Sequence, residues 1–142
     1  MLSIAEAGYK PDDQISLALD AAASEFYEDG HYIIEGNKLS NTEMSDYLVD
    51  LTKIYPIVSI EDGLAEDDWD GWKYLTSEIN DSVQLVGDDL FVTQEKILQK
   101  GIDEKCGNAI LIKVNQVGTI TETLDTMKSV SYTHLRAHET YV

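Results

Sequence analysis

Short apolar runs alternate with amphipathic stretches along most of this chain. The runs at residues 15–20, 57–60, 83–87 and 109–112 are rich in aliphatic and β-branched residues on both faces, which is typical of buried parallel strands. Between them, apolar residues recur at the spacing of three or four positions that an amphipathic helix requires. The repeated order of strand and helix predicts an α/β fold with a parallel sheet covered by helices.

Capping signals mark the starts of two of these helices. Ser40 with Glu43 and Thr119 with Glu122 have the spacing of a capping box. A short helix at residues 2–7 is expected before the first strand. The helical spacing predicts that the following apolar residues face the core: Met44, Tyr47, Leu48, Leu51, Ile54, Trp69, Trp72, Leu75, Ile79, Ile97, Leu98, Ile120, Leu124 and Met127.

The segment between the first and second predicted strands is longer than the segments between the later strands. Residues 27–34 have an Asp29-Gly30 pair at their centre, and this pair between apolar residues predicts a small β-hairpin. The hairpin accounts for the additional length between the first and second strands.

Four consecutive β/α units predict about half of an eightfold barrel, that is, a partial (β/α)8 TIM-type barrel. An open doubly wound sheet is the alternative, but no glycine-rich nucleotide-binding loop follows any of the strands. Half a barrel would expose two strand edges and an uncovered interior face, so we expect the chain to associate or to be poorly soluble.

Residues 130–142 break the pattern, because they show neither clear helical spacing nor a strand ending. We interpret residues 1–129 as the partial barrel and residues 130–142 as a non-homologous tail that is adaptor-derived or disordered. His134 and His138 have a spacing that could hold a metal on a helix, but no third ligand accompanies them.

The composition argues against some classes of binding partner. The formal net charge of −17 over 142 residues argues against nucleic acid and an anionic membrane surface. No apolar run approaches the ~20 residues of a membrane span, and the first residues do not resemble a signal peptide. The single cysteine, Cys106, excludes an internal disulfide and is expected to be structural. These features favour a cytoplasmic protein.

An ionisable residue stands at the end of each of the four predicted strands. Asp20, Glu61 and Asp88 end the first three, and Lys113 ends the fourth. Because parallel strands place their C-terminal ends on one face, these side chains should meet there. Three carboxylates suit Mg²⁺, and a lysine beside a dication can act as a base. Taken singly, each could instead be a turn residue, a helix cap or a solvated charge.

The chain resembles the enolase family, whose members are phosphopyruvate hydratases, and bacterial enolases most of all. The similarity covers residues 1 to about 129. It is carried by AGYKP at 7–11, ALDAAASEFY at 18–27, YPIVSIED at 55–62, AEDDW at 65–69, LVGDDLFVT at 85–93 and IKVNQVGT at 112–119.

The resemblance implies a lyase that converts 2-phosphoglycerate to phosphoenolpyruvate and water in glycolysis. It implies that Asp20, Glu61 and Asp88 bind Mg²⁺ and that Lys113 removes the proton from C2. Glu61, Asp88 and Lys113 would also contact the substrate. It further implies a homodimer or octamer for the full-length protein, and a cytoplasmic location that in some members extends to the cell surface or outside the cell.

The sequence departs from the family pattern at Gly63, where proline is usual, and at Gln94, where asparagine is usual. The N-terminal domain, the residue that acts on the leaving hydroxyl and the later substrate-binding segment have no counterpart here. We therefore expect a truncated, inactive enolase. The alternatives are a non-catalytic fragment that binds other proteins and an enolase-superfamily lyase or isomerase acting on another carboxylate.

Overall fold

The computed structural model describes residues 1–79, 81–133 and 136–139. Its main feature is a five-stranded parallel sheet with the order β1-β5-β6-β7-β8. The strands are β1 (Leu17–Asp20), β5 (Ile57–Glu61), β6 (Gln84–Gly87), β7 (Ala109–Ile112) and β8 (Arg136–Glu139). The order of these strands in the sheet is the same as their order along the chain, and it nowhere reverses. This topology agrees with successive β/α units and disagrees with a doubly wound sheet.

A second, antiparallel sheet follows β1. It contains β2 (Tyr27–Glu28), β3 (His31–Ile34) and β4 (Asn37–Leu39). The predicted hairpin is confirmed, and Asp29 and Gly30 form its turn with φ of 49° and 77°. β4 was not predicted. The turn before β4, at Glu35 and Gly36, also has positive φ at both residues.

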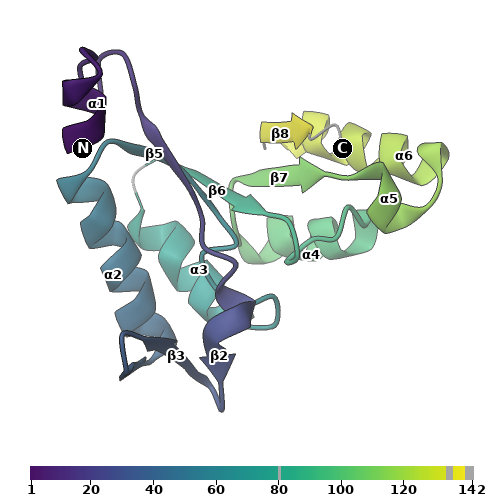
Figure 1. Ribbon diagram of the computed structural model, residues 1–142. Helices are drawn as coiled ribbons and strands as arrows, with labels where there is room; N and C mark the ends of the chain where they lie inside the picture. The colour runs from purple at the N-terminus through teal and green to yellow at the C-terminus, as the bar shows by residue number, and fades with distance from the viewer. Residues whose placement is uncertain (80, 134–135, 140–142) are drawn as a thin grey trace.

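Helices connect the strands. They are α1 (Leu2–Glu6), η1 (Ala23–Phe26, a 3₁₀ helix), α2 (Asn41–Ile54), α3 (Trp69–Glu78), α4 (Glu95–Glu104), α5 (Val114–Val117) and α6 (Ile120–Thr133). Both predicted capping interactions are present, and Ser40 caps α2 in a full capping box. In Figure 1, α2, α3 and α4 lie on one side of the parallel sheet, and α6 packs against α4.

The two faces of the parallel sheet differ in their side chains. One face packs under the helices and contributes Ile60, Leu85 and Ile110 to the main core. Strand side chains alternate between faces, so Glu61, Val86, Ala109 and Leu111 lie on the other face, the interior face. Val86, Ala109 and Leu111 are buried there as a separate cluster. The expectation of an uncovered interior face is therefore wrong for this part of the sheet.

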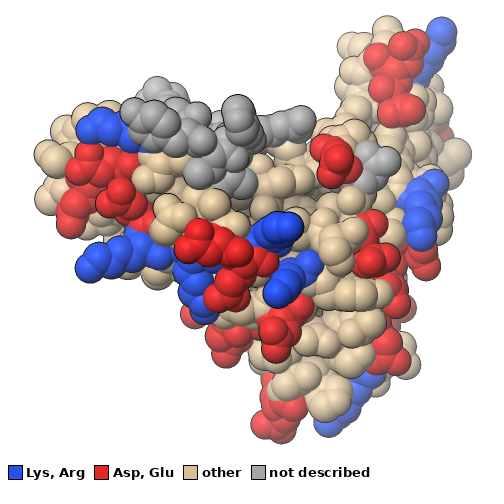
Figure 2. All heavy atoms as spheres, turned by 180° about the vertical axis from the view of Figure 1, so that it is seen from behind, with Lys and Arg blue, Asp and Glu red and all other residues tan. Residues whose placement is uncertain are grey.

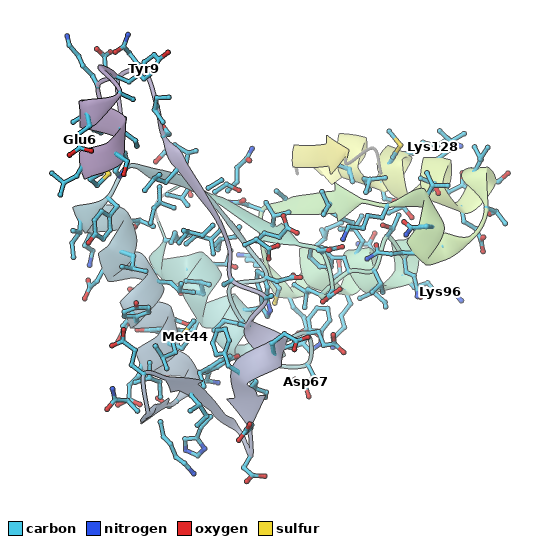
Figure 3. The ribbon with its side chains drawn as sticks, in the orientation of Figure 1. Glu6, Tyr9, Met44, Asp67, Lys96 and Lys128 are labelled. Carbon is cyan, nitrogen blue, oxygen red and sulfur yellow. The ribbon has the colours of Figure 1, made fainter. Side chains whose placement is uncertain are left out.

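The predicted core-facing residues are wrong in part for some of the helices. In α2 the buried residues are Met44, Ser45 and Leu48, whereas Tyr47 and Ile54 are exposed. Figure 3 shows Met44 on α2 near the antiparallel sheet.

The last helix departs furthest from its prediction. In α6, Ile120 and Leu124 are 70% and 48% exposed, whereas Met127 of the predicted stripe packs against the core, and Thr123 and Thr126 are buried. These threonines can be buried because their hydroxyl groups donate to the backbone carbonyls of Thr119 and Glu122, at 2.9 and 3.0 Å.

The end of the chain has secondary structure that the sequence pattern did not predict. α6 continues through Thr133, and β8 pairs in parallel with β7. The histidine pair falls outside the residues whose side chains the structure describes. That residues 130–142 are a non-homologous tail stays a prediction.

Acidic residues outnumber basic ones, with 27 Asp and Glu against 10 Lys and Arg. Figure 2 shows Asp and Glu side chains in several clusters on the face opposite to that of Figure 1, with Lys and Arg among them. Within the described part of the chain, no helix combines the length and the apolar character needed to cross a membrane.

Cys106 follows α4, and its thiol is buried against the backbone carbonyl of Trp69 at 3.6 Å. Burial raises the pKa of this thiol from 9.0 to about 11. Because the thiolate is the reactive form, this higher pKa leaves about 100-fold less of it at pH 8.

We therefore expect a thiol reagent to label the native chain at pH 8 on the order of 100-fold more slowly than the chain in urea, given this thiolate fraction. Ellman's reagent measures both rates. Equal rates in the two states would contradict the buried position of Cys106.

Candidate functional site

The carboxyl ends of the strands bring the four predicted residues together. β1 and β5 pair in register so that Asp20 stands beside Glu61. Glu61 pairs in turn with Val86, and Asp88 lies two residues further on the same interior face. Lys113 follows β7 with the same parity and forms an ion pair with Asp88. The predicted convergence of Asp20, Glu61, Asp88 and Lys113 is therefore what the structure shows.

Asp88 is fixed by two side chains from the segment after β7. Its Oδ2 accepts a hydrogen bond from Lys113 Nζ, and its Oδ1 accepts one from Gln116 Nε2 at 2.8 Å. Gln116 Oε1 in turn accepts a hydrogen bond from the buried hydroxyl of Thr93, also at 2.8 Å. Thr93 Oγ1 accepts one from the Lys113 backbone N–H at 2.9 Å. Asp88 and Lys113 are thus held by one connected network.

Asp62 is a further member of this site, and it is not one of the four residues predicted from the sequence. Its carboxylate accepts hydrogen bonds from the backbone N–H groups of Asp88 and Asp89, each at 3.0 Å. Asp62 is buried, and Asp89 is exposed. These contacts depend on how the loops after β5 and β6 approach each other, so no local sequence signal could have revealed them.

The site carries more negative charge than its own lysine balances. The pKa of Glu61 rises to about 7, first because of burial and then because of Asp20, Asp88 and Asp62, while Lys113 opposes the shift. Burial likewise raises the pKa of Asp62 to about 6, against the effect of its two backbone hydrogen bonds. The hydrogen bond to Asp88 raises the pKa of Lys113. Added positive charge would relieve the repulsion among these carboxylates.

The donor set fits a hard divalent cation. Carboxylate oxygens are the preferred protein ligands of Mg²⁺, and Asp20, Glu61 and Asp88 offer them from three adjacent strand ends. Among the described residues, the carboxylates whose oxygens all lie within 4.8 Å of one another are those of Asp62, Asp88 and Asp89, which form a second set of candidate ligands. Asp88 belongs to both sets. Both oxygens of Asp62 already accept backbone hydrogen bonds, and both oxygens of Asp88 already accept side-chain hydrogen bonds from Lys113 and Gln116.

A polar cavity of about 420 Å³ lies beside the network. Gln116 and Thr93 line it, together with residues of α4 and α6, but Asp88 and Lys113 do not. None of the four strand-end residues lines this cavity.

One comparison with known families bears on this site. The model of the family described as "Enolase, C-terminal TIM barrel domain" matches residues 1–140 of the chain. The match spans the parallel sheet and all four predicted site residues, and it confirms the predicted class of a partial (β/α)8 barrel. With its carboxylates and lysine at the ends of strands arranged in chain order, the chain belongs to the enolase C-terminal domain family, within the enolase superfamily.

Proposed function

We propose that this chain carries the metal-binding and proton-abstracting part of a phosphopyruvate hydratase of bacterial type. Its substrate pair would be 2-phosphoglycerate and phosphoenolpyruvate. The observation that carries the proposal is the placement of Asp20, Glu61, Asp88 and Lys113 on one face at four successive strand ends.

In this proposal, Asp20, Glu61 and Asp88 hold Mg²⁺. When bound, the ion supplies positive charge that stabilises the negative charge developing on the substrate carboxylate. Lys113 takes the proton from the adjacent carbon. In the structure its ammonium group is engaged by Asp88, which raises its pKa, so Asp88 must change partner before Lys113 can act as a base.

Dehydration needs a second proton transfer, to the leaving hydroxyl group. Three of the four site residues are assigned to the ion and the fourth to the base. We propose that residues outside this chain supply the acid, so that the chain is a truncated part of the enzyme. As in the family, we propose a cytoplasmic enzyme that forms a homodimer or octamer.

The expected result for the purified chain is Mg²⁺ binding without turnover. Isothermal titration calorimetry with Mg²⁺ measures the first, and the appearance of phosphoenolpyruvate from 2-phosphoglycerate measures the second. A chain that binds no Mg²⁺ would contradict the assignment of the ligands. A chain that produces phosphoenolpyruvate would contradict the assignment of the acid to other residues.

A further inference from the structure

Asp62 connects three of the strand ends that carry the site. Its backbone N–H donates to the Val86 carbonyl at 3.0 Å, which ties it to β6. Its backbone carbonyl accepts from the Ala23 N–H at 3.0 Å, which ties it to the segment after β1. Its carboxylate holds the loop after β6 through the N–H groups of Asp88 and Asp89. Asp62 itself directly follows Glu61.

The backbone conformation of Asp62 suits this position. Its φ is 40°, in the left-handed region, where aspartate and asparagine are tolerated better than most residues. The side chain is buried, with 6% of the residue exposed. A buried carboxylate with one backbone donor on each oxygen is held in a single orientation, and the peptide between Asp88 and Asp89 is held with it.

From this arrangement we infer that Asp62 is a positioning residue for the metal site, which rests on the function proposed above. It does not bind the ion. It fixes the backbone at Asp88, from which the Asp88 side chain reaches Lys113 and Gln116. Groups that orient metal ligands in this way typically change metal affinity 10- to 100-fold when they are replaced.

The variant Asp62→Asn tests the inference. Asparagine tolerates the same φ and nearly fills the same volume, but it has one acceptor oxygen, and its NH₂ group faces the second backbone N–H. We expect the Kd for Mn²⁺, measured by electron paramagnetic resonance of free Mn²⁺, to rise about 10-fold with an unchanged stoichiometry. Loss of all binding, as expected for a ligand, would overturn the inference, and so would an unchanged Kd.

Asp68→Asn is the matched control. Asp68 is a buried aspartate of similar connectivity: its carboxylate accepts from Tyr32 Oη at 2.6 Å and from the Gly71 N–H at 3.0 Å. It contacts none of the four strand-end residues in these bonds. We expect Asp68→Asn to lower the melting temperature while leaving the Kd for Mn²⁺ unchanged. An equal rise of Kd in both variants would show a general loss of structure and would overturn the positioning role.

A measurement on the wild-type chain covers the case in which Asp62→Asn does not fold. Hydrogen exchange of the Asp88 and Asp89 amides, followed by NMR, should be slow without metal and remain slow with Mg²⁺. If Mg²⁺ drew the Asp62 carboxylate away as a ligand, both amides would exchange faster and the inference would fail. A wild-type chain that binds neither Mg²⁺ nor Mn²⁺ would instead refute the proposed function.

Discussion

Replacing Asp88 by asparagine is expected to abolish Mg²⁺ binding. Asp88 is the carboxylate common to both possible ligand sets, it is buried, and an amide nitrogen cannot replace the lost ligand oxygen. Replacing a group that only orients a metal ligand typically lowers metal affinity 10- to 100-fold. We therefore expect Asp88→Asn to lower the affinity for Mg²⁺ by more than about 100-fold. Isothermal titration with Mg²⁺ measures it, with circular dichroism to verify folding.

Asp89→Asn is the control, because Asp89 is its exposed neighbour and belongs only to the second set. We expect Asp89→Asn to bind Mg²⁺ with nearly the wild-type affinity and Glu61→Gln to bind it much more weakly. The opposite result, with loss in Asp89→Asn and retention in Glu61→Gln, would place the ion among Asp62, Asp88 and Asp89.

Replacing Phe91 by alanine is expected to cause a large loss of stability. Phe91 is fully buried and packs against Gly87 and Gly101, where an added Cβ would collide with its ring, at 2.6 Å in the case of Gly87. Removing a buried phenyl ring typically costs about 3–5 kcal/mol, a large share of the 5–15 kcal/mol that stabilises a typical domain. Urea unfolding followed by circular dichroism measures the free energy of unfolding.

The second phenylalanine of the chain offers the matched control. Phe26 is half-buried and makes an edge-to-face contact with Tyr32, with ring centroids 6.2 Å apart. We expect Phe26→Ala to lower the free energy of unfolding clearly less than Phe91→Ala does. If the two variants lost the same stability, the loop after β6 would not depend on the packing of Phe91.

Much of the fold could be predicted because its signals are local. The capping box at Ser40, the Asp29-Gly30 turn and the apolar strand runs each need only neighbouring residues to be recognised. The convergence of Asp20, Glu61, Asp88 and Lys113 could also be predicted, since the common direction of parallel strands determines it.

The features that were missed depend on long-range contacts. Thr126 is buried because its hydroxyl reaches the backbone carbonyl of Thr93 at 2.9 Å as well as that of Glu122. A helical hydrophobicity pattern treats such a residue as polar and outward-facing, so it favoured Leu124 instead. Asp62 was missed for the same reason, because its hydrogen-bond partners are contributed by a different β/α unit.

The antiparallel sheet supports the loop after β5 although it contributes none of the four strand-end residues. The hydroxyl of Tyr32, on β3, donates to Asp68 and accepts from the Ala65 N–H at 3.0 Å, so it braces the loop that begins at Asp62. Deleting residues 27–39 to make a regular barrel unit would leave that amide and the carboxylate of Asp68 without this partner. The insertion that lengthens the first crossover therefore supports the loop after β5. A redesigned, shorter crossover would need another group to replace the Tyr32 hydroxyl as the partner of Asp68 and of the Ala65 N–H.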